Sequence, residues 1–362
     1  MASITTTPVS LPAPPSIGKK RSVALRNLRE RLIMAGLLFC GFFTVATTLA
    51  IVTILGTHMW AFFTHDMIDA QGSVTHVSII DFLFGLEWNP LLGAQKHFGI
   101  WPLVAGTMMV TVIAMLFALP LGLITAIWLS EYANPRVRAV IKPVLEIIAG
   151  IPTVVFGFFA LTVITPTLRF AFWPVAVLGA DGQPMLDAAG QAITEPYNPL
   201  NFGTYNALAA GLAVGIMCIP IVTSLSEDAL RAVPRALREG AYGLGSSKFE
   251  TSVKVVIPAA LSGIIAAFLL AVARAVGETM IVSLAAGAAP LPLYSDPAMI
   301  VDPRSQVQTM TGYMVQIFLG DVEHGGVEYL SCYTVAGTLF IITFGLTLIG
   351  GAIRRRFRQA YD

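Results

Sequence analysis

The sequence predicts an all-α, polytopic membrane protein with six transmembrane helices. Of its 362 residues, 56% are hydrophobic and only 12% are charged, and the mean hydropathy is +0.75. A soluble domain carries about 25% charged residues, so this chain belongs to the membrane class. Its apolar residues gather into six stretches of roughly the 20 residues or more that a helix needs to cross a bilayer. The short alternating segments typical of membrane β-barrels are absent.

The six predicted spans are Leu32–Ala61, Gly99–Leu129, Pro143–Ile164, Tyr205–Leu225, Pro258–Ala288 and Cys332–Ile353. The first apolar run is too long for the core of a signal peptide and lacks an A-x-A site, which favours an uncleaved span. We expect four regions: a disordered, basic arm at 1–31, the first helix with its external loop at 32–98, a core at 99–353 and a basic tail at 354–362. Ser, Thr and Pro dominate residues 1–18, a composition typical of disorder.

Basic residues are distributed unevenly among the loops. The arm, the links 130–142 and 226–254 and the tail hold 18 Lys and Arg residues, whereas Lys96, Arg169 and Arg304 are alone in the other three loops. By the positive-inside rule, both termini are cytoplasmic. Because the basic residues serve orientation and the net charge is only +1, no nucleic-acid partner is expected. The three cysteines lie in or beside apolar segments and indicate no disulfide framework.

Three charged side chains fall inside the predicted spans: Glu146, Arg274 and Glu278. Glu146 lies one turn after Lys142 near a cytoplasmic end, where pairing or snorkelling makes a structural role sufficient. Arg274 lies 16 residues after Pro258, which is about 24 Å of helix and well into the bilayer. Each buried charge of this kind costs about 2.5–3.5 kcal/mol, so Arg274 and Glu278 must face protein or a water-filled path.

Two interpretations of Arg274 and Glu278 remain open. Their spacing of four residues allows an ion pair on one helix face, although Arg before Glu is the weaker order. Alternatively, the Arg274 guanidinium contacts an oxyanion, because it stays charged when desolvated and offers a planar fork of donors. Glu278 then holds Arg274 in place, neutralises the empty site or favours a protonated substrate.

Helix-breaking residues form a second set of candidates. The second span contains Pro120 with Gly122, the third contains Gly150 with Pro152, and the fourth contains Pro220 as candidate interruptions. Proline frees a carbonyl that protein or water must satisfy, and such breaks often line transport paths. The strongest candidate is Gly150-Ile151-Pro152-Thr153, which adds a hydroxyl. The Gly211 and Gly215 pair is typical of close helix packing rather than of a functional site.

The polar stretch between Leu225 and Lys254 has the composition of a water-exposed elbow. It contains Glu239-Gly240-Ala241 and then Gly245 as a turn residue, and Pro258 opens the following helix. This spacing resembles the EAA loop of ABC-importer permeases, a short helix-turn-helix that docks onto a cytoplasmic ATPase. The loop is expected to cover residues 226–258.

Four further segments make the resemblance more specific. They resemble PstC-type phosphate permeases of the binding-protein-dependent transport family: FGIWPLVAGT (98–107), LSEYANP (129–135), AGIPTVVFGFFAL (149–161) and ARAVGETM (273–280). The resemblance implies a type I ABC-importer permease fold in the bacterial inner membrane. It also implies partners: a homologous PstA-type permease, two PstB-type ATPases that bind the ATP, and a PstS-type phosphate-binding protein. ARAVGE is shared with sulfate and molybdate permeases, which therefore remain alternative functions.

The resemblance assigns roles to particular residues. Arg274 and Glu278 become the phosphate-path pair, with Gly150, Pro152 and Thr153 as further path residues. The residues that couple the path to the ATPase become Glu239, Gly240, Ala241, Gly245 and Pro258. Closure of the ATPases would then rock the elbow and turn the path from outward-open to inward-open.

Enzyme and cofactor motifs are missing from the sequence. No G-x-x-x-x-G-K-[ST], H-E-x-x-H or nucleophile elbow is present, so neither nucleotide binding nor catalysis by this chain is expected. The five histidines match no zinc spacing, and no metal or cofactor is expected. One other class stays open, a secondary transporter that uses Glu278 as a proton carrier.

Overall fold

The computed structural model describes residues 23–64, 67–68, 74–91, 96–170, 174–176, 194–196, 202–295, 297–323 and 325–356. By its internal contacts the chain divides into residues 1–54 and 55–362. This division differs from the expected regions 32–98 and 99–353, because residues after 54 pack into the larger unit.

The first unit is described from the start of helix α1 (Val23–Thr64). The apolar part of α1 runs over Asn27–Thr64, which confirms the first span. Residues 23–31 belong to the helix, so the expectation that the whole arm is disordered is wrong for them. Leu, Arg and Glu dominate this part of the arm, and these are strong helix formers. Residues 1–18 of the predicted arm lie outside the described residues.

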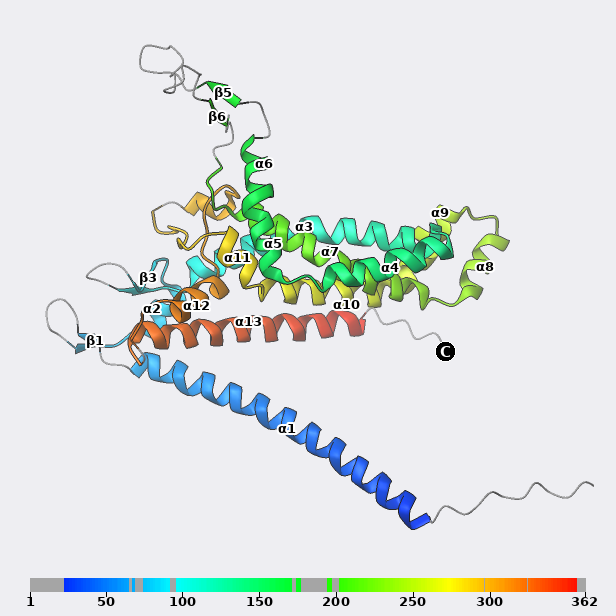
Figure 1. Cartoon of the computed structure of the whole chain (residues 1–362), viewed down its shortest axis with the longest axis horizontal. Coiled ribbons are helices and arrows are strands. Elements are labelled where there is room, and N and C mark those ends of the chain that lie inside the picture. The colour runs from blue at the N-terminus through cyan, green and yellow to red at the C-terminus, as the bar shows by residue number, and fades with distance from the viewer. Residues whose placement is uncertain are drawn as a thin grey trace, which may run out of the picture. The chain divides into compact units, whose positions relative to one another are not determined.

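The second unit is a helical bundle (Figure 1). Its long helices are α3 (Trp101–Ile127) with the π-helical turn η1 (Trp128–Tyr132), α7 (Ala207–Arg231), α10 (Ile257–Val276) and α13 (Val327–Arg356). Within the described residues, five helices including α1 are long and apolar enough to cross a membrane. A bent pair of shorter helices makes a sixth. The all-α, polytopic class is therefore confirmed.

The third predicted span is not one helix. Helix α4 (Pro135–Ala149) ends at Gly150, and the chain turns by 87° into α5 (Thr153–Phe159), η2 (Ala160–Ile164) and α6 (Thr165–Phe170). Pro152 lacks an N–H group and disfavours helical dihedrals in the residue before it, which favours a break at this position. The predicted span Pro143–Ile164 therefore consists of two helices that meet at the break expected at Gly150 and Pro152. The first of these helices begins at Pro135, where Asn134 Oδ1 accepts a hydrogen bond from the Arg136 N–H. By contrast, α3 continues through Pro120 and α7 continues through Pro220, so these two prolines do not break their helices.

The fifth predicted span is also interrupted. Its helix begins before Pro258, with α9 (Lys248–Thr251) and the π-helical turn η3 (Ser252–Val256) leading into α10. Helix α10 ends at Val276, and a separate short helix, α11 (Met280–Ala285), follows. The prediction of one helix over Pro258–Ala288 is therefore wrong at both ends. Gly277 at the C-cap is a common helix terminator.

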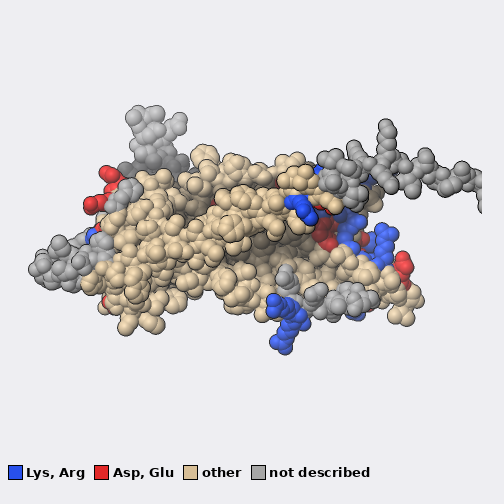
Figure 2. Space-filling model, turned by 90° about the horizontal axis from the view of Figure 1, so that it is seen from below, with Lys and Arg blue, Asp and Glu red and all other residues tan. Residues whose placement is uncertain are grey.

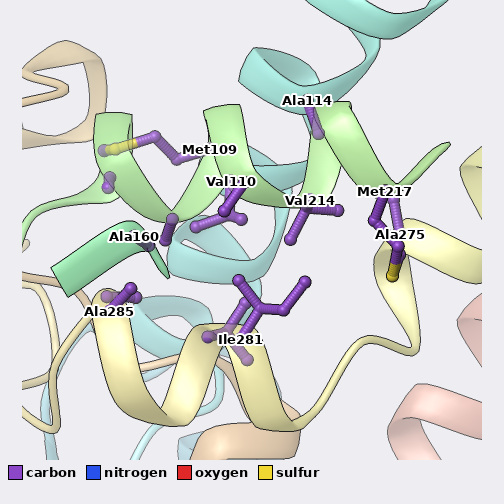
Figure 3. Close-up of a cluster of buried hydrophobic side chains, with 14 of the residues drawn as sticks. Met109, Val110, Ala114, Ala160, Val214, Met217, Ala275, Ile281 and Ala285 are labelled. Carbon is purple, nitrogen blue, oxygen red and sulfur yellow. The ribbon is translucent and has the colours of Figure 1, made fainter. Parts of the chain in front are cut away.

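Helices α3 and α7 pack closely, because glycines remove the side chains between them. A Cβ atom on Gly211 would lie 2.6 Å from Ile113 Cγ2, and one on Gly215 would lie 3.0 Å from the Ala114 carbonyl oxygen. The interpretation of Gly211 and Gly215 as packing residues is confirmed. Side chains of α3, α7, η2, α10 and α11 meet in the main core beside this contact (Figure 3).

The loops between the spans contain short elements. Among the loop residues that the structure describes, there are three two-stranded antiparallel pairs: β1 (Met67–Ile68) with β2 (Val74–Thr75), β3 (Trp88–Asn89) with β4 (His97–Phe98), and β5 (Pro174–Ala176) with β6 (Thr194–Pro196). The short helices are α2 (Ile79–Phe84), η4 (Pro297–Val301) and α12 (Met310–Leu319). Phe62, Phe82, Trp88 and Tyr313 belong to a second buried cluster that joins this region to α13.

Candidate functional site

Arg274 and Glu278 lie on either side of the break between α10 and α11. Arg274 occupies the last turn of α10 and is exposed, and its Nη2 atom lies 3.7 Å from Met217 Sδ on α7. Glu278 is only 7% exposed, and its Oε1 atom accepts a hydrogen bond of 3.4 Å from the Ile281 N–H. Its carboxylate therefore caps the start of α11.

Arg274 and Glu278 form no ion pair. Among the described residues, no carboxylate oxygen lies within 4.0 Å of the Arg274 guanidinium. Because α10 ends between the two residues, the spacing of four does not place them on one continuous helix face. Both nevertheless lie within electrostatic range of Cys218 on α7. An unpaired cation at the end of an apolar helix is free to meet an anion.

Threonines that the sequence analysis did not single out hold the break in place. Thr311 on α12 donates a 2.6 Å hydrogen bond to the Glu278 carbonyl oxygen, and Thr309 pairs with Thr311. Thr107 on α3 accepts a 3.0 Å hydrogen bond from the Met310 N–H. Thr311 thus satisfies a carbonyl at the break between α10 and α11, and Thr107 satisfies an N–H group at the start of α12. Polar residues within apolar segments were the signal that could have identified them.

Gly150, Pro152 and Thr153 form the bend between α4 and α5. Helix α5 then packs directly on α11, because a Cβ on Gly157 would lie 3.2 Å from the Ile281 Cα atom. The bend is thus connected through α5 to the helix that Glu278 caps. Within the described residues, no hydrogen bond joins Thr153 to Arg274 or Glu278.

The polar stretch folds into a helix-turn-helix. Helix α8 (Arg235–Gly243) carries Glu239, Gly240 and Ala241, and the chain turns at Gly245, whose φ angle of +82° favours glycine. Ser247 and Glu250 form a capping box that starts α9. Pro258 lies in the first turn of α10, where its missing N–H costs little.

The elbow exposes apolar side chains. Leu244 is 90% exposed and Phe249 is 67% exposed, whereas Ala241 is buried against the rest of the unit. Figure 2 shows charged side chains gathered toward the end of the molecule that bears α8 and α9, while the middle of that face is largely uncharged. An apolar tip with a charged surround is suited to contact with another protein.

Two buried carboxylates near the elbow were also missed by the sequence analysis. Glu131 in η1 pairs with Arg238 of α8, with an Nη2–Oε1 distance of 2.9 Å. Glu227 of α7 is fully buried, with Arg138 Nε at 2.7 Å and Lys142 Nζ at 3.1 Å, both from α4. In the sequence, both carboxylates lie at the end of an apolar span beside a basic link, and this position could have identified them.

Comparisons with known proteins agree with this geometry. Residues 118–359 match the family model described as binding-protein-dependent transport system inner membrane component. The chain is 29% identical to the probable ABC transporter permease protein YqgH of Bacillus subtilis, over 92% of each chain. It is 31% identical to the phosphate transport system permease protein PstC of Xylella fastidiosa, over 75% of this chain and 77% of that one.

One solved structure shares the fold. A bacterial ABC transporter involved in the import of the acidic polysaccharide alginate gives a TM-score of 0.51 at 13% identity, covering 93% of this chain and 99% of that chain. The comparisons indicate a transport subunit rather than an enzyme, with ATP hydrolysis carried out by a partner subunit. The chain belongs to the inner membrane components of binding-protein-dependent transport systems, a family of ABC transporter permeases.

Proposed function

We propose that this chain is the permease subunit of an ATP-driven phosphate importer and forms half of the translocation path. The observation that supports this most directly is the Arg274 guanidinium, which ends an apolar helix without a carboxylate partner among the described residues. The similarity to a relative named as a phosphate permease points to the same substrate.

The chemistry of Arg274 suits a phosphate-like anion. A guanidinium presents parallel N–H donors that match two oxygens of an oxyanion, and it keeps its charge in a poorly solvated site. Glu278 is buried nearby, and its negative charge offsets that of Arg274 when no anion is present. The bend at Gly150, Pro152 and Thr153 lets α5 shift relative to α4 and thereby change the shape of the path.

The elbow is the proposed contact with the ATPase. The small residues Gly240 and Ala241 permit close approach, Glu239 is exposed, and the turn at Gly245 presents Leu244 at the tip. In this assignment both termini are cytoplasmic. The partners are a homologous PstA-type permease, two PstB-type ATPases and a PstS-type phosphate-binding protein.

Uptake by the reconstituted transport complex tests this assignment. We expect labelled phosphate to enter proteoliposomes only when ATP is supplied to the ATPase side, and unlabelled phosphate to compete better than sulfate or molybdate. Stronger competition by sulfate or molybdate would transfer the assignment to that oxyanion. Uptake driven by a proton gradient without ATP would instead support a secondary transporter that uses Glu278.

A further inference from the structure

Arg238 joins three separate elements at the base of the elbow. From α8, its guanidinium forms a two-pronged pair with Glu131 in η1, at Nη2–Oε1 2.9 Å and Nε–Oε2 3.4 Å. The same group donates to the Leu230 carbonyl oxygen at 2.9 Å and to the Val233 carbonyl oxygen at 2.7 Å. One side chain thus ties α8 to the end of the α3 helix and to the end of α7.

This contact is well shielded from water. The Arg238 side chain is 16% exposed and the Glu131 side chain is 5% exposed. A pair held by two parallel hydrogen bonds has a fixed geometry, unlike an exposed ion pair that is screened and mobile. The Leu230 carbonyl also accepts a hydrogen bond of 3.3 Å from the Val233 N–H, so Arg238 reinforces the turn that closes α7.

A second cluster joins α4 to the same end of α7. Glu227 is fully buried between Arg138 and Lys142, and Lys142 also pairs with Asp228. If α4 moved away from α7, Glu227 would lose both partners on α4 and keep only the longer contact of 3.9 Å with Arg231 of its own helix. We call η1, α4, α8 and the last turn of α7 the charged block.

Breaks in regular helix lie at the edges of the charged block. Glu131 lies in the π-helical turn η1, and a second π-helical turn, η3, lies between α9 and α10. The 87° bend after α4 forms the third edge and leads through α5 to α11, which Glu278 caps. An open pocket of about 460 Å³, lined by residues of η1, α4, α7 and α8, lies beside the Arg238 side chain. The pair of Arg238 with Glu131 joins the α8 side of this pocket to its η1 side.

We propose that Arg238 and Glu131 are positioning residues that transmit movement of α8 to α3 and α4. The charged block then moves as one rigid body, and the segment Gly150–Pro152 acts as its joint to α5 and α11. This inference rests on the proposed docking of the elbow to an ATPase. It adds the route by which that movement reaches the break between Arg274 and Glu278.

Distances within the full transport complex test the proposal without reference to the substrate. One pair of spin labels, at Gly243→Cys on α8 and Ala139→Cys on α4, reports on the block, because both positions are exposed. A second pair, at Ala139→Cys and Phe158→Cys on α5, spans the joint. The native cysteines are replaced, and spectra are compared without nucleotide and after trapping with ATP and vanadate.

In the parent complex, the distance within the block should shift by less than about 2 Å on trapping, while the distance across the joint changes. In Arg238→Gln, we expect trapping to change the distance within the block and no longer to change the distance across the joint. Recovery of the ATPase in a detergent pull-down should equal that of the parent. Transport per ATP hydrolysed should fall about tenfold.

Further variants separate this role from simple support of the fold. Glu131→Gln should reproduce the effects of Arg238→Gln, and the double variant should be no worse than either one, because both remove the same contact. Arg238→Lys keeps the charge but loses the fork, so it should fold and show an intermediate loss. The matched control is Arg136→Gln on α4, where the exposed guanidinium has no ion pair among the described residues.

Three results would overturn the proposal: an unchanged joint response in Arg238→Gln and Arg238→Lys, additive effects in the double variant, or loss of ATPase recovery as the sole defect. Failure of the proposed function looks different. If the parent complex transports another oxyanion, the distances still test the positioning role. If the parent chain binds no ATPase, the docking assignment itself fails and the route proposed here falls with it.

Discussion

Gly211→Ala should destabilise the protein through a clash at the contact between α3 and α7. The new Cβ would lie 2.6 Å from Ile113 Cγ2, 2.7 Å from Ile113 Cβ and 3.2 Å from the Val110 carbonyl oxygen. Ile113 is β-branched and has little rotamer freedom in a helix, so it cannot move aside. The two helices must separate locally instead.

The expected size follows from two opposing effects. Overpacking of this kind costs about 1–3 kcal/mol, while replacing glycine by alanine in a helix returns about 1 kcal/mol. The net loss should be about 1 kcal/mol. Gly345→Ala on α13 is the matched control, because a Cβ at Gly345 meets nothing within 4 Å. That variant keeps the helix-propensity gain without the clash.

The two variants are compared by their unfolding. Each purified chain in mild detergent is titrated with a denaturing detergent, and the loss of helix is followed by circular dichroism. Gly211→Ala should unfold at a lower denaturant fraction than the parent, and Gly345→Ala at the same or a higher one. The difference between the variants isolates the clash. Equal midpoints for the two would refute the packing argument for α3 and α7.

Three further predictions concern the elbow, the charged block and the loop that contains Asp302. Gly245→Asp should uncouple transport, because a φ of +82° strains a non-glycine residue and the turn presents the docking tip; equal ATPase recovery with mutant and parent would count against this. Glu227→Gln should lower stability by about 1.5–3 kcal/mol, since Arg138 loses its carboxylate partner and Lys142 keeps only Asp228; a thermal midpoint within error of the parent would contradict this. Hydrogen bonds from the Arg304 side chain lower the pKa of Asp302. The loop should therefore lose stability as the pH falls through that lowered pKa, and loop proteolysis should show no such acid dependence in Asp302→Asn.

The sequence analysis succeeded where composition alone decides the structure. The lengths of the apolar stretches predicted the positions of the membrane-spanning helices. Charge-poor spans separated by basic links indicated a polytopic protein. The turn at Gly245 and the packing at Gly211 could be inferred because glycine is required there for local reasons, a positive φ in one case and close backbone approach in the other. Such features depend on few distant contacts.

Helix continuity was harder to predict, because apolar composition does not distinguish one span from two shorter helices. Pro152 was noted as a break, yet the 87° bend depends on α5 packing across α11 through Gly157. The break after Val276 likewise depends on a hydrogen bond from Thr311, 33 residues away in the sequence. Nothing near Glu278 in the sequence predicts that partner.

The ionic contacts of the charged block illustrate the same limit. Glu131 and Arg238 are 107 residues apart, and Lys142 and Glu227 are 85 residues apart. Sequence spacing indicates pairs within one helix, such as the ion pair that was one interpretation of Arg274 and Glu278, but it does not predict pairs between helices. The structure lacks the pair of Arg274 with Glu278, although it contains the i,i+4 pair of Glu227 with Arg231. The pairs between helices are additional.

Phosphate uptake by Arg274→Gln tests most directly whether a guanidinium in the membrane attracts the transported anion. Assembly and ATPase recovery should match the parent, and uptake should be at least about tenfold lower, because a hydrogen bond to a charged group contributes about 1.5–3 kcal/mol. Arg136→Gln should transport normally. Parent-level uptake by Arg274→Gln, in membranes with equal amounts of inserted protein, would contradict the account.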